Sequence, residues 1–318
     1  MTKLFTPTEV AEGSLLLGRW QLQNDELYTP LLGGVIKTIV TGSDQLTLTV
    51  ANRHHPLMPS HYWAVRVNHT AWRRYSAALP IEVALPAERN LVEIMTAGNT
   101  DLDDVWSGNQ GFALTKLELK GAGRLIKPSP RPVVAIYGDS ITAGCWVNGY
   151  GASSDYRPEQ NFVGLAQDKI DVDLARVAYS AAGVLRPATG GVPVAIDWLD
   201  HFNAQTPWPP HPVSLSVINL GVNDRRFSEA DFATAYEQYV TAFLKRQTDP
   251  VAVALMIPFA QSMANVIRAT AQYHQLPVIE TTGWCASFTD GLHPDLTGAQ
   301  QAAPRFAMAL TRLLNERM

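Results

Sequence analysis

Apolar and polar residues alternate in short runs along the first third of the chain. Residues 45–50 read Gln-Leu-Thr-Leu-Thr-Val, and residues 117–120 read Leu-Glu-Leu-Lys. A period of two is typical of β-strands that bury one face and expose the other. Turn-forming residues separate the runs, as in Thr-Gly-Ser-Asp at 41–44. We therefore predict an all-β, jelly-roll-like sandwich, with strands over residues 34–40, 45–51, 62–67, 81–85, 90–95 and 112–119.

The pattern changes after Pro-Ser-Pro-Arg-Pro at 128–132, a stiff segment that we interpret as a linker between residues 1–127 and 133–318. Beyond it, continuous apolar runs alternate with stretches of helical periodicity. This alternation predicts a three-layer α/β/α domain with a buried parallel sheet. The expected strands are 133–137, 215–220, 251–257 and 277–280, and the expected helices are 229–246, 261–273 and 298–315.

Composition places the chain among ordinary globular proteins of two domains, with 318 residues, 46% hydrophobic and 17% charged. The net charge is −4, and no basic cluster is visible in the sequence, so we expect no nucleic-acid partner. The N-terminus lacks the apolar stretch of a secretory signal, and no run approaches the roughly 18 apolar residues of a membrane span. We therefore expect a cytoplasmic protein without a membrane partner.

The two cysteines, Cys145 and Cys285, lack metal-ligand spacing, and we expect no metal or organic cofactor. Edge strands of the predicted sandwich could pair subunits, so a homo-oligomer stays open.

Two of the expected parallel strands run directly into candidate catalytic residues. Residues 133–137 lead into Gly-Asp-Ser at 138–140, and residues 215–220 lead into Gly-Val-Asn-Asp at 221–224. Active sites of open α/β sheets form at the carboxyl ends of strands. Ser140 is the candidate nucleophile, and the Asn223 amide could donate to a developing oxyanion without carrying a charge. The structural alternatives are that Ser140 caps a helix and that Asn223 forms a turn.

A third segment, Asp-Gly-Leu-His-Pro at 290–294, supplies a candidate base. Asp290 lies three residues before His293 and can hold one ring nitrogen, which leaves the other free to take the serine proton. The alternative is a histidine without a function on the surface. The other seven histidines lack a comparable placement, and we assign them no role.

These segments together resemble the SGNH hydrolases, also called the GDSL esterase/lipase superfamily. Four blocks match in the family's order: Gly-Asp-Ser-Ile at 138–141, Tyr-Ser-Ala-Ala-Gly at 179–183, Gly-Val-Asn-Asp at 221–224 and Asp-Gly-Leu-His at 290–293. The resemblance implies a triad of Ser140, His293 and Asp290. It also implies an oxyanion hole formed by the N–H groups of Ser140 and Gly183 and by the Asn223 amide. The joint match outweighs the separate structural alternatives.

A β-sandwich ahead of such a domain is similar to the carbohydrate esterases of family 2, which remove acetyl groups from plant-type polysaccharides. This resemblance implies a serine esterase for short-chain acyl esters, acetyl above all, with an ester or acetylated saccharide as substrate. Two features depart from that family. Its members often lack the triad aspartate, whereas Asp290 is present here. They also usually carry a secretion signal, which is not visible in this sequence.

The substrate-binding residues are the least readable part of the sequence. Asp139, Trp146 and Trp284 lie beside the catalytic segments and are candidates to line the cleft, although the two indoles could equally be packing residues. Trp63, Trp72 and Trp106 could form a sugar-binding surface, but core packing is the favoured interpretation. The alternative functions are a lysophospholipase, thioesterase or acyltransferase on the same triad, or a catalytically inert carbohydrate-binding protein.

Overall fold

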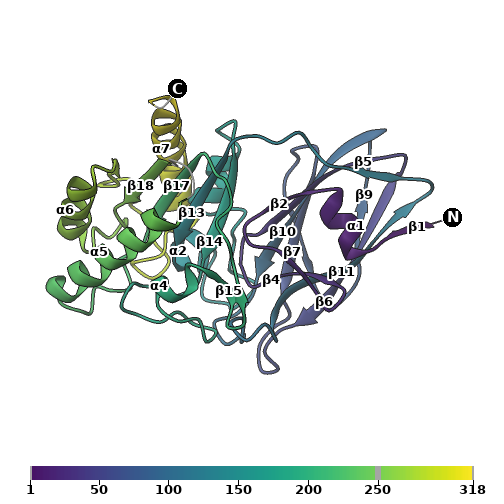
Figure 1. The fold of residues 1–318 in the computed structure, drawn as a ribbon. Coiled ribbons are helices and arrows are strands. Elements are labelled where there is room, and N and C mark those ends of the chain that lie inside the picture. The colour runs from purple at the N-terminus through teal and green to yellow at the C-terminus, as the bar shows by residue number, and fades with distance from the viewer. Residues whose placement is uncertain (1, 248–251, 317–318) are drawn as a thin grey trace.

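The computed structural model describes residues 2–247 and 252–316, which form an N-terminal all-β part and a C-terminal α/β part. Figure 1 shows the two parts side by side, with the parallel sheet and its helices on the left and the antiparallel sheets on the right. The expected linker at 128–132 lies between strand β12, which ends at Ile126, and strand β13, which begins at Val133.

Two antiparallel sheets pack face to face in the N-terminal part, as the alternating pattern predicted. One sheet has the order β3-β4-β11-β6-β9, with β1 paired to β11, and the other has the order β12-β5-β10-β7-β8, with β2 paired to β5. All six predicted strands are present, and the short strands around them were not predicted. The bounds are β1 Thr2–Phe5, β2 Leu15–Leu17, β3 Gln21–Gln23, β4 Glu26–Thr29, β5 Val35–Thr41, β6 Gln45–Arg53, β7 Tyr62–Val67, β8 Arg73–Ser76, β9 Ile81–Ala84, β10 Arg89–Gly98, β11 Gly111–Lys120 and β12 Arg124–Ile126.

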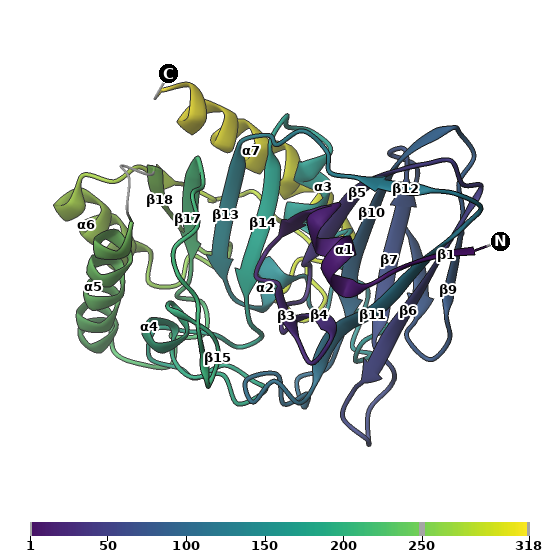
Figure 2. The same ribbon diagram turned by 45° about the vertical axis from the view of Figure 1, so that its right-hand side comes forward.

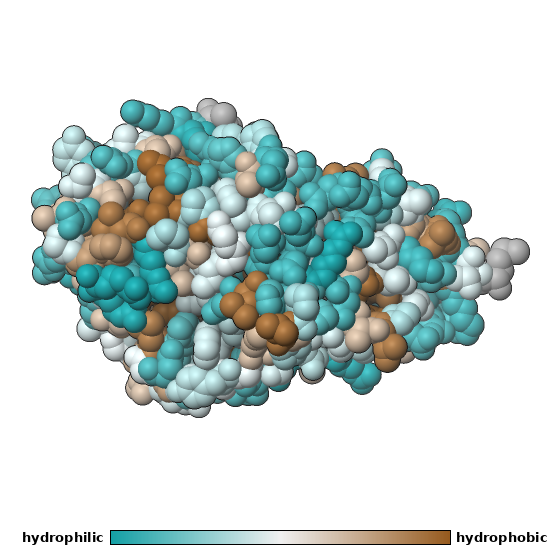
Figure 3. Space-filling view, turned by 90° about the horizontal axis from the view of Figure 1, so that it is seen from below, coloured by the Kyte–Doolittle hydropathy of each residue, from teal (hydrophilic) through white to brown (hydrophobic). Residues whose placement is uncertain are grey.

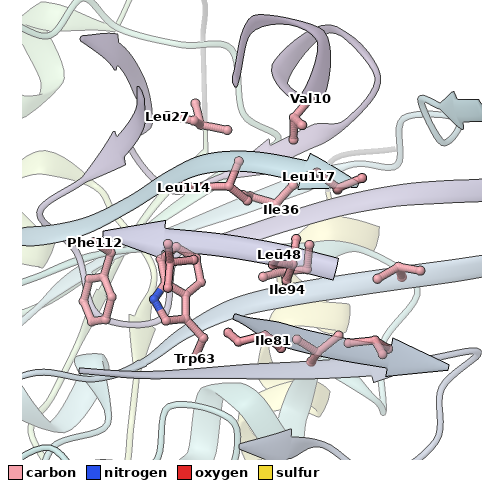
Figure 4. Close-up of a cluster of buried hydrophobic side chains, with 14 of the residues drawn as sticks. Val10, Leu27, Ile36, Leu48, Trp63, Ile81, Ile94, Phe112, Leu114 and Leu117 are labelled. Atoms are coloured by element: carbon pink, nitrogen blue, oxygen red, sulfur yellow. The ribbon is translucent and has the colours of Figure 1, made fainter. Parts of the chain in front are cut away.

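The core of the sandwich consists of side chains from the inner faces of both sheets (Figure 4). Trp63 and Ile94 from one sheet and Leu48 and Phe112 from the other are fully buried. Each such side chain contributes about 1.5–3 kcal/mol of hydrophobic free energy. Helix α1 (Pro7–Glu12) adds Val10 to this core, and the reciprocal hydrogen bonds of a capping box fix where the helix begins.

The C-terminal part has a five-stranded sheet in the order β14-β13-β17-β18-β19, and all its pairs are parallel. Helices cover both faces, which confirms the three-layer prediction. Helices α3 and α7 pack on one face, and helices α4, α5 and α6 pack on the other. The bounds are β13 Val133–Gly138, α2 Ser140–Ala143, α3 Phe162–Gln167, β14 Asp173–Ala178, α4 Ala195–Trp198, β15 His201–Asn203, β16 Thr206–Pro207, β17 Leu215–Asn219, α5 Glu229–Arg246, β18 Ala252–Met256, α6 Ala264–His274, β19 Val278–Ile279 and α7 Leu296–Asn315.

Strand β14 was not predicted from the sequence, because charged residues interrupt its apolar pattern. It forms the edge of the parallel sheet that faces the N-terminal part (Figure 2). Buried Asp173 lies 2.9 Å from the Lys37 ammonium of the sandwich. Buried Arg176 donates to the carbonyl oxygens of Gly33 and Pro158 at 3.2 and 2.7 Å. Lys37 and the Gly33 carbonyl of the N-terminal part, together with the Pro158 carbonyl, therefore give the charged side chains of this strand polar partners.

Element bounds differ from the prediction by a few residues. Helix α6 begins at Ala264 rather than at 261, because Met263 before it has a left-handed backbone with φ of +57°. Strand β18 begins at Ala252, and Val251 of the predicted run 251–257 lies outside the described residues. Within residues 2–247 and 252–316, no helix combines the length and the apolar character that a membrane crossing requires.

Candidate active site

The candidate nucleophile lies where the order of the parallel strands reverses. The chain proceeds from β13 to β14 on one side and then returns to β17 on the other, so the ends of β13 and β17 are neighbours. Ser140 directly follows β13 as the first residue of α2, and Asn223 lies in the turn after β17. Such a switch point is the usual ligand-binding position of doubly wound sheets.

Asp139, not Ser140, is the N-cap of α2. Its carboxylate accepts the N–H of Ile141 at 2.9 Å, which leaves the Ser140 hydroxyl free of the capping role. Asp139 is only 2% exposed, so its side chain holds the turn from below. The buried position of Asp139 therefore does not favour the predicted contact between this side chain and a substrate.

Ser140, His293 and Asp290 form one continuous chain of hydrogen bonds. The Oγ of Ser140 lies 2.8 Å from Nε2 of His293, and Nδ1 of the same ring lies 2.8 Å from Oδ2 of Asp290. Ser140 and His293 are buried, at 4% and 8% exposed. With Nδ1–H donating to the carboxylate, Nε2 has its lone pair directed at the serine hydroxyl. This is the geometry of a serine nucleophile with a general base and its orienting acid.

The loop that carries His293 also keeps Asp290 ionised. Partial burial raises the pKa of this carboxyl. The N–H and imidazole of His293 and the N–H of Leu292 outweigh that effect and hold the pKa below its usual value. The two backbone N–H groups donate to Oδ1 at 2.7 and 3.0 Å, so the imidazole meets the other carboxylate oxygen. Asp290 therefore orients His293 through two separate contacts.

The amide of Asn223 has a fixed orientation. Its Nδ2 donates to the Ala182 carbonyl at 3.0 Å, and its Oδ1 accepts from Nη1 of Arg186 at 3.2 Å. Asn223 is 4% exposed. Because Arg186 has donors only, it requires the amide oxygen on its own side, and the amide nitrogen keeps a second N–H for another acceptor. The sequence analysis did not single out Arg186, since it lies outside the four blocks.

Gly183 is engaged differently from the expectation. Its N–H donates to the Arg186 carbonyl at 3.0 Å, so it is not free to meet an oxyanion in this structure. A Cβ at this position would lie 2.4 Å from a carboxylate oxygen of Asp224, which explains the need for glycine. Asp224 in turn accepts the backbone N–H groups of the next three residues, 184–186.

Ala181 offers an N–H in the same turn that sequence reasoning missed. Its backbone is left-handed, with φ of +62°, and its N–H has no hydrogen-bond acceptor among the described residues. A left-handed alanine costs about 1–2 kcal/mol, so the surrounding fold must impose this conformation.

A buried carboxylate lies beneath the nucleophile. Burial, with a smaller contribution from the negative charge of Asp224, raises the pKa of Asp139 to about 7, against the opposing effect of hydrogen bonds from backbone N–H groups. Burial also raises the pKa of Asp224. Burial below the catalytic turn therefore disfavours the ionised form of both carboxyl groups.

The N-terminal sandwich supports the catalytic turn from the side. Its hydrophobic core continues into Ala143 and Cys145, which follow the nucleophile, and into Tyr156. The Tyr156 hydroxyl donates to Asp101 of the N-terminal part at 3.0 Å. Displacing the sandwich would therefore disturb the packing under Ser140.

Trp146 lies beside the catalytic histidine. Its ring centroid is 6.0 Å from that of His293, and its carbonyl accepts the Thr289 hydroxyl at 2.6 Å. The exposed Tyr150 packs edge-on against the same indole. Trp146 and Tyr150 thus form an aromatic wall on one side of the base.

Trp284 lies elsewhere. It lines a groove between β19 and the middle of α7, together with Arg305 and Met308. The structure does not place it against Ser140 or His293. The first-domain indole Trp63 is fully buried in the sandwich core, as the packing interpretation predicted.

Residues 136–301 match the model of the GDSL-like lipase/acylhydrolase family. The chain belongs to this family. It is a carboxylic ester hydrolase of the SGNH superfamily, as the four blocks implied. No curated protein sequence matches the chain.

Solved structures share the whole two-part fold at low sequence identity. A family two carbohydrate esterase from Cellvibrio japonicus has a TM-score of 0.81 at 16% identity, covering 100% of this chain and 99% of that one. An acetyl xylan esterase from Butyrivibrio proteoclasticus has a TM-score of 0.74 at 15% identity, with coverage of 98% and 99%. A salicylyl-acyltransferase from a tetracycline biosynthetic pathway has a TM-score of 0.68 at 16% identity, with coverage of 98% of both chains. At this identity the likeness establishes the shared architecture, that of the family two carbohydrate esterases.

Proposed function

We propose that this GDSL esterase hydrolyses short-chain acyl esters, above all acetyl esters of sugars, through Ser140, His293 and Asp290. The observation that carries the proposal is the unbroken hydrogen-bond chain from the serine hydroxyl through the imidazole to the carboxylate. A hydroxyl at 2.8 Å from a neutral imidazole nitrogen is within reach for proton transfer as it attacks a carbonyl.

In the first step, Oγ of Ser140 attacks the ester carbonyl carbon while Nε2 of His293 accepts the hydroxyl proton. Asp290 stabilises the resulting imidazolium. The tetrahedral intermediate collapses when His293 returns the proton to the leaving alkoxide, which departs as the alcohol. Water then attacks the acyl-enzyme with His293 as base, which releases the acid and restores Ser140.

The oxyanion of each tetrahedral intermediate would meet the Ser140 N–H and the second N–H of the Asn223 amide. The turn after β14 would supply a third donor. We assign that donor to the Ala181 N–H, because the Gly183 N–H is already donated to Arg186. Each such donor typically lowers the barrier by about 2.7–4 kcal/mol.

Two observations support a short acyl group and a sugar alcohol. The architecture matches that of proteins described as a family two carbohydrate esterase and an acetyl xylan esterase. Seen from below, the surface carries its apolar residues in several patches that polar residues separate (Figure 3). A long fatty acyl chain would require a larger continuous apolar surface.

The test is hydrolysis of p-nitrophenyl acetate, butyrate and octanoate by the wild type and by Ser140→Ala, with Ser76→Ala on strand β8 as the matched control. We expect the rate to fall with chain length, Ser140→Ala to be inactive and Ser76→Ala to be unaffected. Octanoate as the best substrate would favour the lipase or thioesterase alternative. Equal rates for Ser140→Ala and the wild type would refute the catalytic assignment.

Acyl transfer is the second candidate, because the same fold occurs in a salicylyl-acyltransferase. Both reactions share the acyl-enzyme and differ only in whether water or an alcohol attacks it. Adding methyl glucoside to the p-nitrophenyl acetate assay separates them. A hydrolase forms acetate in proportion to the nitrophenol released, whereas a transferase forms acetylated glucoside at the expense of acetate.

A further inference from the structure

Three arginines gather beside the predicted oxyanion hole, although they come from two separate segments. Arg225 and Arg226 follow Asn223 and Asp224 in the turn after β17. Arg186 lies in the turn after β14, with its Nη1 3.2 Å from Oδ1 of Asn223. The two turns are joined because the Asp224 carboxylate accepts three backbone N–H groups from residues 184–186. These hydrogen bonds hold the backbones of the two turns in place relative to each other.

These guanidinium groups have no carboxylate partner. Within residues 2–247 and 252–316, no acidic oxygen lies within 4.0 Å of Arg186, Arg225 or Arg226. Many other arginines of the protein are paired. Arg66 bridges Glu93 and Asp168, for example. Arg186 and Arg225 donate only to neutral oxygens, those of the Asn223 amide and the Val222 carbonyl, so their positive charges are not neutralised and favour a bound anion.

Burial and nearby charges both act on Arg186. Partial burial lowers the pKa of this guanidinium, and the positive charges of Arg226 and Arg225 lower it further, against the opposing effect of the Asp224 and Asp101 carboxylates. The carboxylate of Asp224 beneath them is occupied by backbone N–H groups and is itself buried. Arg225 and Arg226 are exposed, so an anion from solution can reach them.

We propose that Arg186, Arg225 and Arg226 bind an anionic group, a carboxylate or a phosphate, on the alcohol half of the ester, so that the preferred substrate is an acylated acidic sugar. Guanidinium groups match the planar oxygens of carboxylate and phosphate with paired donors. Arg186 contacts Asn223, the predicted oxyanion donor, so an anion held there would lie on the same side of the substrate as the reacting carbonyl. The inference rests on the proposed function and adds the charge of the substrate to it.

The first experiment compares three monoacetylated sugars of the same ring size: methyl glucoside, methyl glucuronoside and methyl glucoside 6-phosphate. We expect KM for an anionic ester to be lower than for the neutral ester by about tenfold or more, the range of charge-assisted hydrogen bonds. The glucuronoside and the phosphate distinguish the two sources of the charge, and a preference for either supports the proposal. Equal KM values for all three esters would overturn it.

The second experiment removes the exposed charges. Arg225→Gln/Arg226→Gln should raise KM for the anionic ester towards that of the neutral one, with a much smaller effect on kcat for the neutral ester, because glutamine retains a donor for the Val222 carbonyl. Arg73→Gln/Arg124→Gln, which removes two exposed charges from the N-terminal part, is the matched control and should keep the preference. At about 1 M salt, where the Debye length is about 3 Å, the wild-type preference should shrink. A preference that survives in Arg225→Gln/Arg226→Gln would contradict the assignment.

Binding of the same three esters to Ser140→Ala by calorimetry separates the inference from the proposed function. Failure of the wild type to hydrolyse any ester, together with tighter binding of the anionic ester, would reject the esterase mechanism and keep the anion site. Hydrolysis of p-nitrophenyl acetate without any anion preference in rate or binding would reject the anion site alone.

Discussion

Nε2 of His293 lies 2.8 Å from Oγ of Ser140, although 153 residues separate the two in the chain. Ser140 is held at the end of β13 by the cap from Asp139, and His293 is held in its loop by Asp290. Local hydrogen bonds thus position each member of the reactive pair, and the sheet brings the two segments together. Each of them can be tested separately.

Replacing Asp290 by Asn keeps the size of the side chain and removes its charge. We expect kcat to fall by about 10⁴-fold, because Asn can hold the imidazole in the wrong tautomer, as in other serine hydrolases. Steady-state kinetics on p-nitrophenyl acetate measures the effect, and an unchanged thermal midpoint shows that the fold is intact. A loss smaller than about tenfold would mean that Asp290 is dispensable for catalysis.

The amide of Asn223 and its partner Arg186 should affect catalysis unequally. Asn223→Ala removes an oxyanion donor and should lower kcat by about 10² to 10³-fold. Arg186→Gln removes the group that orients the amide oxygen, and we expect a smaller loss of kcat. If both variants keep the wild-type kcat, the oxyanion hole lies elsewhere.

Arg186 acts through Asn223 in this scheme, so the two effects should not add. In the double variant Asn223→Ala/Arg186→Gln, kcat for a neutral ester should match that of Asn223→Ala alone. Additive losses would show that Arg186 contributes to the neutral reaction independently.

Asp139 should make the protein less stable as the pH rises. Its pKa is raised from 3.8 to about 7 in the folded state, mainly by burial. Between these values the folded protein holds a proton that the unfolded chain has lost, so the contribution of Asp139 to stability is fully present below about pH 4 and is lost as the pH rises through about 7. Three pKa units correspond to roughly 4 kcal/mol.

Asp139→Asn cannot ionise and can still cap α2, so it should lack this decline. Urea unfolding at several pH values measures the difference in stability between variant and wild type, which should shift in favour of the variant by a few kcal/mol between pH 4 and 8. A difference that is constant over this range would show that Asp139 is not the titrating group.

Gly183→Ala should disturb the site through Asp224. The new methyl group would lie 2.4 Å from a carboxylate oxygen that accepts backbone N–H groups, so the turn 183–186 must shift. We expect both lower stability, by about 1–3 kcal/mol, and lower kcat. Thermal unfolding and kinetics on p-nitrophenyl acetate check the two effects. A fully active and stable variant would show that this close approach is not required.

The sequence by itself determined the local features of this protein. Alternation of apolar residues predicted the sandwich strands, because a half-buried strand needs that pattern whatever its partners are. The four short blocks identified the family and proposed Ser140, His293, Asp290 and Asn223, because the chemistry requires those residue types and the family carries them in that order.

Only the tertiary structure decided the features that depend on contacts distant in sequence. Strand β14 carries Asp173 and Arg176, which look unsuited to a buried strand until Lys37 of the other part pairs with Asp173 and the Gly33 carbonyl accepts a hydrogen bond from Arg176. The Gly183 N–H is donated to Arg186, which no motif reveals. The three arginines do not form a continuous basic run in the sequence. Arg186 and Asn223 are 37 residues apart, and they come into contact because Asp224 accepts hydrogen bonds from the backbone of the turn that carries Arg186. Pairing of charges and hydrogen bonds is a property of the folded chain, and it fixed what the sequence pattern left open.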